Sequence, residues 1–269
     1  VYAPVTHWVW GGGILSYWGT MDFAGGIVVH ATAGTAALVT ALTLGKRRGF
    51  PKSITPPHSP ILTMIGASML WIGWFGFNAG SALGANGGAG MAMLVTHISA
   101  ATASLVWMFI EWKRFGKPSL IGIVTGMVAG LATVTPASGY IGVPGGLILG
   151  FIGGLLCYLA VDYIRGKLQI DDSLDVFAVH GVGGILGTLL VAFLATSSFS
   201  GLGLAEGQTG ISQFIIQLKA VVLTVVWTSF FTYLILKLTS LIVSLRVDEQ
   251  EEIEGLDLRS HGEKGYHSD

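Results

Sequence analysis

The segments DFAGGIVVH at residues 22–30 and DVFAVHGVGG at residues 175–184 each place a histidine inside a run of apolar residues. An aspartate opens each segment, and glycines lie beside both histidines. An ionisable side chain at membrane depth is costly and is a functional candidate by default. Because glycine lets helix backbones approach closely, the two rings can come into contact. The segments therefore predict an all-α membrane bundle in which His30 and His180 meet.

The composition of the 269-residue chain fits a membrane protein and excludes several other classes. Hydrophobic residues make up 52% of the chain and charged residues 11%, whereas a water-soluble protein carries about a quarter charged residues. A net charge of -1 gives no basic surface for nucleic acid. The single cysteine, Cys157, excludes an intramolecular disulfide, and no Cys/His cluster offers a zinc site.

Charge-poor runs predict seven complete membrane spans, since about 20 apolar residues cross a bilayer core of about 30 Å. The predicted spans cover residues 22–45, 60–83, 87–112, 119–137, 142–164, 175–197 and 212–245. Residues 1–10 precede them and are interpreted as the outer end of an eighth, truncated helix, because three glycines follow at once. The chain does not begin with Met, and we expect it to start inside a longer protein.

The basic residues predict the orientation of the spans. They cluster at residues 46–52, 113–117 and 165–167 and after residue 236, whereas the intervening connections have no Lys or Arg. Only Lys219 departs from this pattern. The positive-inside rule then places these loops and the C-terminal tail in the cytoplasm.

This orientation makes the two histidine segments run in opposite directions through the membrane. Asp22 begins a helix that enters from outside, and Asp175 begins one that enters from inside. That pattern is typical of an inverted-topology repeat with a shared site near the midplane. Each histidine could instead satisfy its own helix–helix hydrogen bond, but the matched pair favours a function. A carboxylate at a helix start caps free N–H groups, so a structural role for both aspartates is at least as well supported as a chemical one.

Aromatic residues form a second group at the predicted outer ends of two helices. The group comprises Trp8, Trp10, Trp71, Trp74, Phe75 and Phe77, and it lies near Ser81. An interfacial aromatic belt explains most membrane tryptophans. The alternative is a vestibule in which an indole face and a hydroxyl replace part of the hydration shell of a small cation. Position alone favours the belt.

Several runs along the whole chain resemble the ammonium transporter (Amt/Rh/MEP) family. They are VWGGG (9–13), DFAGG (22–26), WFGFNAGS (74–81), GKPSL (116–120), TPASGYIG (135–142), DVFAVHG (175–181), GLD (255–257) and HGE (261–263). The resemblance implies an eleven-span homotrimer in the plasma membrane, the inner membrane of a bacterium, with one narrow apolar pore in each subunit. The chain resembles the end of the fourth span and all of the fifth to eleventh, and the missing N-terminal part would include one gate phenylalanine.

The same resemblance implies roles for particular residues, and none of them involves a cofactor or a metal. His30 and His180 look like the twin pore histidines. Trp10 and Ser81 look like the outer ammonium recruitment site, Phe77 like a gate phenylalanine, Trp74 like a pore-lining residue and Asp22 like the structural aspartate. Residues 1–245 would form the transmembrane domain, and residues 246–269 a cytoplasmic regulatory tail that can help a PII signal protein dock.

Three other functions remain open at this point. An ammonium sensor could use the same fold and signal through its tail. A membrane hydrolase or metalloenzyme would need a nucleophile or a third metal ligand, and the sequence has no G-x-S-x-G or H-E-x-x-H signature. The chain could also be a non-conducting fragment of a transporter.

Overall fold

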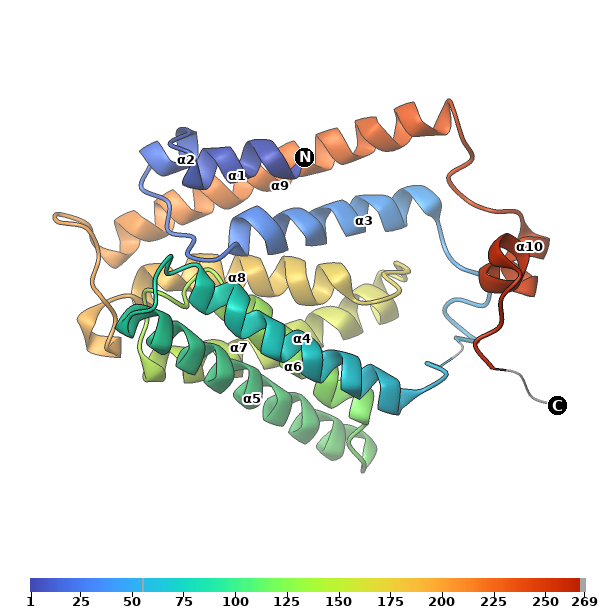
Figure 1. Cartoon of the computed structure of the whole chain (residues 1–269), viewed down its shortest axis with the longest axis horizontal. Coiled ribbons are helices and arrows are strands. Elements are labelled where there is room, and N and C mark those ends of the chain that lie inside the picture. The colour runs from blue at the N-terminus through green and yellow to red at the C-terminus, as the bar shows by residue number, and fades with distance from the viewer. Residues whose placement is uncertain (55, 267–269) are drawn as a thin grey trace.

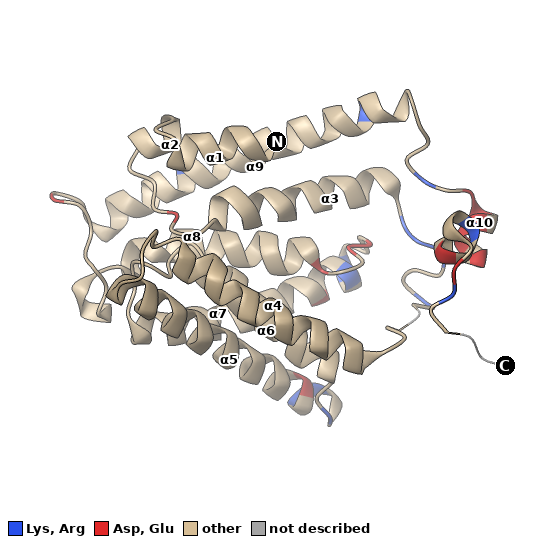
Figure 2. Ribbon diagram, in the orientation of Figure 1, with Lys and Arg blue, Asp and Glu red and all other residues tan. Residues whose placement is uncertain are grey.

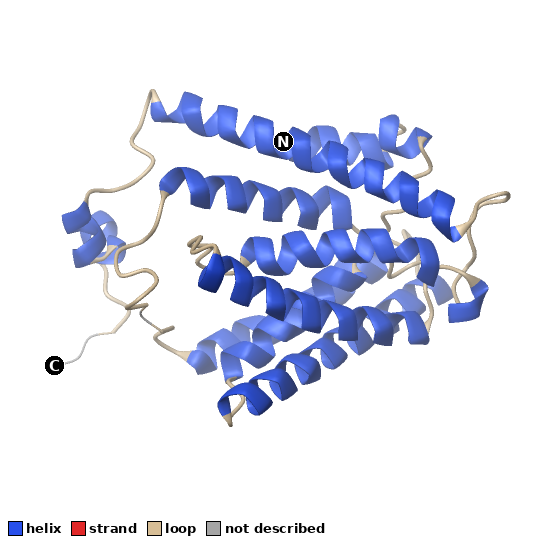
Figure 3. Cartoon of the chain, turned by 180° about the vertical axis from the view of Figure 1, so that it is seen from behind, coloured by secondary structure: helices blue, strands red, loops and turns tan. Residues whose placement is uncertain are grey.

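The structure, a computed structural model, describes residues 1–54 and 56–266 of the chain. Its described residues form helices joined by loops, with no strand among them (Figure 3). The longer helices lie side by side as one bundle, and two short helices near the C-terminus lie beyond one end of it (Figure 1). The α-helices are α1 (Tyr2–Trp10), α2 (Ile14–Tyr17), α3 (Thr32–Leu44), α4 (Pro60–Gly80), α5 (Gly87–Phe115), α6 (Leu120–Val134), α7 (Val143–Val161), α8 (Val182–Leu194), α9 (Gly210–Ser240) and α10 (Glu249–Glu254). The π-helical and 3₁₀ turns are η1 (Gly26–Ala31), η2 (Asp162–Lys167), η3 (Phe177–Gly181), η4 (Ser197–Phe199) and η5 (Asp257–His261).

Six helical runs are long and apolar enough to cross a membrane. They are Gly26–Leu44, Pro60–Gly80, Gly87–Phe115, Val143–Lys167, Phe177–Leu194 and Gly210–Ser240. The fourth predicted span, residues 119–137, contains the shorter α6, which has 15 residues. It ends early because the chain turns at residues 135–140, which include Pro136. The polytopic helical prediction is therefore confirmed, with six full-length spans rather than seven.

Side chains at the loop–helix junctions explain why several helices begin where they do. Ser59, Asn86 and Ser119 each accept a hydrogen bond from a backbone N–H in the first turn of the helix that follows. Thr209 and Ser212 form a reciprocal capping box at the start of α9. These caps satisfy N–H groups that have no partner within the helix.

Small residues allow α5, α6 and α7 to pack closely. A Cβ on Gly130 of α6 would meet the carbonyl oxygen of Ser99 and the Cβ of Ala103 on α5. Ser99 in turn donates a hydrogen bond to the Gly130 carbonyl, with 2.8 Å between the oxygens. Gly154 of α7 also lies against the backbone of Ala103. Membrane helices that carry small residues at their interface gain packing and interhelical hydrogen bonds.

The two helices that carry the histidines run in opposite directions through the bundle (Figure 1). The two helices approach closely at two glycines, one on α3 and one on α8. A Cβ on Gly34 of α3 would collide with the backbone of Gly181, and a Cβ on Gly184 of α8 would collide with the Cβ of His30. The close approach that the sequence predicted is thus present.

Most charged residues gather at one end of the bundle (Figure 2). This end includes the loops after α3, α5 and η2 and the helix α10. The basic clusters that the sequence placed on one side of the membrane therefore lie at one end of the bundle.

Candidate functional site

His30 and His180 are in direct contact between η1 and η3. Their Nδ1 atoms lie 3.1 Å apart, and their ring centroids lie 5.2 Å apart. His30 is 2% exposed, and its Nε2 has no hydrogen-bond partner within the described part of the chain. Contact between the two rings, predicted from opposed segments and flanking glycines, is confirmed.

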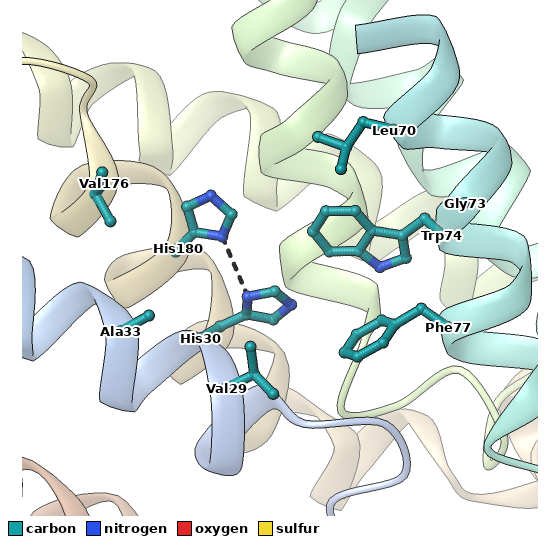
Figure 4. A pocket seen from close by; sticks show the side chains of 9 residues that line it. All are labelled: Val29, His30, Ala33, Leu70, Gly73, Trp74, Phe77, Val176 and His180. Atoms are coloured by element: carbon teal, nitrogen blue, oxygen red, sulfur yellow. Dashed lines mark hydrogen bonds between the residues drawn. The ribbon is translucent and has the colours of Figure 1, made fainter. Parts of the chain in front are cut away.

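The histidine pair lines one side of a cavity of about 420 Å³ (Figure 4). Trp74 and Phe77 of α4 lie across this cavity from the histidines. The remaining lining residues are small or apolar: Val29, Ala33, Leu70, Gly73 and Val176. Polar groups in this cavity therefore come almost entirely from the two imidazoles.

Trp74 stacks on the His30 ring, with centroids 5.2 Å apart and an interplanar angle of 16°. Its indole N–H donates to the Thr135 hydroxyl at 3.0 Å, and that hydroxyl donates to the Leu131 carbonyl. The indole is thus fixed by a hydrogen bond and is 6% exposed. The aromatic-belt interpretation is wrong for Trp74, because a belt residue faces the membrane interface.

Asp22 caps the helix that carries His30. Its two carboxylate oxygens accept four backbone N–H bonds, at 2.7–3.1 Å, from the consecutive residues 25–28. Gly25 has φ 118°, a left-handed conformation that favours glycine. This turn is why residues 22–25 are not helical, although the predicted span began at residue 22. Asp22 is 3% exposed, so its carboxylate is buried against the N–H groups that it caps.

The corresponding cap of the His180 helix comes from Asp172 and not from Asp175. Asp172 accepts hydrogen bonds from the backbone N–H groups of Val176 and Phe177, at 2.9 and 2.7 Å. The carboxylate of Asp175 instead lies 2.8 Å from Arg165. The prediction that the Asp175 carboxylate caps this helix is therefore wrong. A signal was available, because Asp172 precedes His180 by eight residues, as Asp22 precedes His30.

Trp10 and Ser81 occupy two helix ends at the same end of the bundle. Trp10 is the last residue of α1, and Ser81 directly follows α4. The Trp10 indole N–H donates to the Asp22 carbonyl at 2.8 Å, and Ser81 donates its hydroxyl to the Phe77 carbonyl at 2.9 Å. Trp10 is 46% exposed. The hydrogen bonds of these two side chains go to different partners, so their pairing stays a prediction.

The geometry limits what the histidine pair can do. Two Nδ1 atoms at 3.1 Å can share one hydrogen bond if one ring donates and the other accepts. Each ring then presents Nε2, as an N–H or as a lone pair, to a third group. The protonation of two such rings is coupled.

The fold and this site define a polytopic helical membrane protein whose only histidine pair within the described residues meets beside an apolar cavity. The chain belongs to the Ammonium Transporter Family, whose family model matches residues 1–266. This is a family of transporters and not of enzymes.

Individual relatives support the same assignment. The chain is 49% identical over 269 residues to ammonium transporter Amt1 of Archaeoglobus fulgidus, covering 99% of this chain and 67% of that protein. It is 47% identical over 267 residues to an ammonium transporter of Aquifex aeolicus, covering 99% of this chain and 62% of that protein.

Solved structures are also similar. A structure described as a sensor Amt protein has a TM-score of 0.89 at 32% identity, covering 97% of this chain and 66% of that chain. Mep2 of Candida albicans has a TM-score of 0.83 at 36% identity, and the match covers 93% of this chain and 58% of the Mep2 chain. The chain thus spans about two thirds of the length of its relatives or less.

Proposed function

We propose that this chain is the larger part of a protein that moves ammonium across a membrane as ammonia through a narrow apolar pore. Trp10 and Ser81 recruit the cation at the outer mouth, and Phe77 gates the pore. Trp74 lines it, and His30 with His180 form the site inside. Asp22 and Asp172 hold the two histidine helices in place.

The observation that carries the proposal is the contact of two imidazoles beside an otherwise apolar cavity. Such a cavity strongly disfavours a bare cation, whereas a neutral small amine crosses at lower free energy. The unpartnered Nε2 of His30 is a group to which ammonia could hydrogen-bond. Potassium has no proton to lose, so the same path rejects it.

The wider architecture is proposed from the family resemblance. The helices correspond to the end of the fourth span and the fifth to eleventh spans of an eleven-span inverted repeat, with α6 as the eighth. Residues 1–245 form the transmembrane domain of a homotrimer in the plasma (inner) membrane. Residues 246–269 form a cytoplasmic tail.

Uptake by the full-length protein tests the function. The protein would be expressed in cells that lack their own ammonium uptake, and radiolabelled methylammonium accumulation would be measured. We expect uptake that ammonium inhibits and that equal potassium leaves unchanged. Uptake no greater than in cells with an empty vector, at a confirmed membrane level of the protein, would refute the proposal.

A sensor is the second candidate, because one of the similar structures is described as a sensor Amt protein. A sensor would change the conformation or the partner binding of its tail when ammonium is added, without supporting uptake. The same uptake experiment therefore separates the two functions.

The tail contacts the loop between α3 and α4. Arg246 donates to the carbonyls of Leu44 and Lys46 and makes a bidentate ion pair with Glu252. The backbone N–H of Arg48 also donates to Glu252. The hydrogen bonds from Arg246, followed by that from Arg48, hold the pKa of Glu252 below its ordinary value. The carboxylate therefore stays ionised at neutral pH, and the tail has a defined attachment on this surface.

Deleting residues 255–269 should reduce transport or abolish binding of a PII signal protein. The reason is that the deletion leaves the anchor at Arg246 and Glu252 but removes η5 and the segment that resembles the family's regulatory tail. Uptake and PII pull-down from membranes would measure the two effects. If the truncated protein matches the intact one in both assays, the tail is only a solvated end; residues 267–269 of this deletion lie outside the described residues.

A further inference from the structure

Gln217 is a buried amide whose hydrogen-bonding capacity is completely used. It lies on α9 and is fully buried. Its Oε1 accepts from the Met21 backbone N–H at 2.8 Å and from Nε2 of Gln213 at 3.2 Å. Its Nε2 donates to the carbonyls of Met21 at 2.7 Å and of Thr188 at 2.9 Å. An amide offers two lone pairs and two N–H donors, and all four have partners here.

These four hydrogen bonds fix the orientation of the amide, which packing of an apolar side chain between helices would not require. If the oxygen and nitrogen exchanged places, the NH₂ would face the Met21 N–H, and the oxygen would face two carbonyls. An apolar residue of similar length would fill the same space without the desolvation of an amide. The polar side chain therefore has a use in holding the backbone of Met21, both of whose groups it binds.

The segment that Gln217 holds leads directly to the proposed site. Met21 precedes Asp22, whose carboxylate caps the helix of His30 and whose carbonyl binds the Trp10 indole. Gln213 adds a bond from its Nε2 to the carbonyl of Gly19 at 3.0 Å. The segment at residues 19–22 is thus fastened to α9 at two points.

The fourth bond of Gln217 reaches the other histidine helix. Thr188 lies on α8, which continues from η3 and His180. One side chain on α9 therefore connects the segment before His30 with the helix after His180. No residue of α9 lines the cavity of the two histidines.

We propose that Gln217 is a positioning residue for the outer cation site. Its amide sets where Met21 and Asp22 lie, and through them the placement of the Trp10 indole. This inference rests on the proposed transport function. A helix that does not contact the cavity thereby influences how the solute is bound.

The test compares Gln217→Glu and Gln217→Met in the full-length protein with Thr228→Val. The carboxylate in the first variant has almost the same shape but loses both donors, and the second loses all four bonds. Thr228 is fully buried on the same helix, and its hydroxyl has no partner within the described residues. Its replacement therefore controls for loss of a polar group on α9.

We expect both Gln217 variants to raise the methylammonium concentration for half-maximal uptake about tenfold, with the maximal rate per protein within about twofold of normal. The loss of two or more hydrogen bonds is sufficient for a change of that size. Thr228→Val should leave both parameters unchanged. A fall in the maximal rate alone, with unchanged half-saturation, would show a purely structural role and overturn the proposal.

Hydrogen exchange supplies a measurement that does not depend on transport. Peptides covering residues 14–30 should exchange faster in both Gln217 variants. In Gln217→Met the Met21 N–H loses its acceptor, and in Gln217→Glu the Met21 carbonyl loses its donor. The same peptides should exchange at an unchanged rate in Thr228→Val. Unchanged exchange would refute the positioning role. If the unaltered protein does not transport, the proposed function fails, and exchange still decides this inference. If Gln217→Met does not accumulate, Gln213→Met should give a smaller effect of the same kind, because it frees the Gly19 carbonyl and one lone pair of Gln217 Oε1 but keeps both bonds between Gln217 and Met21.

Discussion

Replacing His30 or His180 with leucine in the full-length protein should lower methylammonium uptake by about 10- to 150-fold or abolish its discrimination against potassium. A buried donor or acceptor that is left without its partner costs about 1–3 kcal/mol, and the upper part of that range corresponds to such a fall in rate. Leucine also leaves the other ring without its partner at 3.1 Å. Radiolabelled uptake, normalised to the amount of protein in the membrane, would measure both effects.

His97→Leu is the matched control for these two variants. His97 lies on α5 and stacks on Trp71, with ring centroids 5.2 Å apart. It does not line the cavity of the histidine pair. Its replacement should leave uptake within about twofold. Normal uptake and normal potassium discrimination in His30→Leu and His180→Leu would exclude the proposed role of the pair.

The sequence predicted the contact of the histidines because the determinants of that contact are local. Gly181 and Gly184 beside His180 are visible in the sequence, and their lack of a side chain is what lets them lie against Gly34 and His30. On the other helix the close approach is made at Gly34, whereas Gly25 forms the turn before the helix. The long apolar runs were equally direct, since a span needs mainly length and hydropathy. Family, helical class and most span positions were therefore predicted correctly.

Other features were missed because they depend on backbone geometry at helix ends. The turn at Gly25 and the turns at residues 135–140 shorten two predicted spans, and both follow from local conformation rather than from hydropathy. Asp175 was predicted as the cap because it stands directly before the apolar run, whereas Asp172 lies three residues earlier. The cap is instead made from eight residues before the histidine, as in the His30 helix.

Tertiary partners explain the remaining errors. Trp74 resembles an interfacial tryptophan in sequence, and only the fold shows that Thr135 binds its indole and that His30 stacks on it. Gln217 gave no signal, because its four hydrogen bonds go to three residues that lie 4 to 196 positions away in the chain. Pairing of Trp10 with Ser81 stays a prediction.

Removing the Asp22 carboxylate should have the largest effect on stability of any single substitution at the site. Asp22→Ala leaves four buried N–H groups without acceptors. Each such group costs about 1–3 kcal/mol, so the sum of about 4 kcal/mol or more approaches the whole stability of many proteins, about 5–15 kcal/mol. We expect the variant either to fail to accumulate or to unfold at a much lower temperature, without uptake, when the full-length protein is heated in detergent.

Two further variants make this prediction specific to the cap. Asp22→Asn keeps one oxygen for two of the four N–H groups but turns an NH₂ toward the other two, so it should recover at most about half of the loss. Asp172→Ala removes two bonds and should destabilise less than Asp22→Ala. The expected order of unfolding temperature is therefore unaltered protein first, then Asp22→Asn and Asp172→Ala, and Asp22→Ala last. An Asp22→Ala protein with the same unfolding temperature as the unaltered protein would show that water or another group replaces the carboxylate. The cap would then not explain how His30 is held in place.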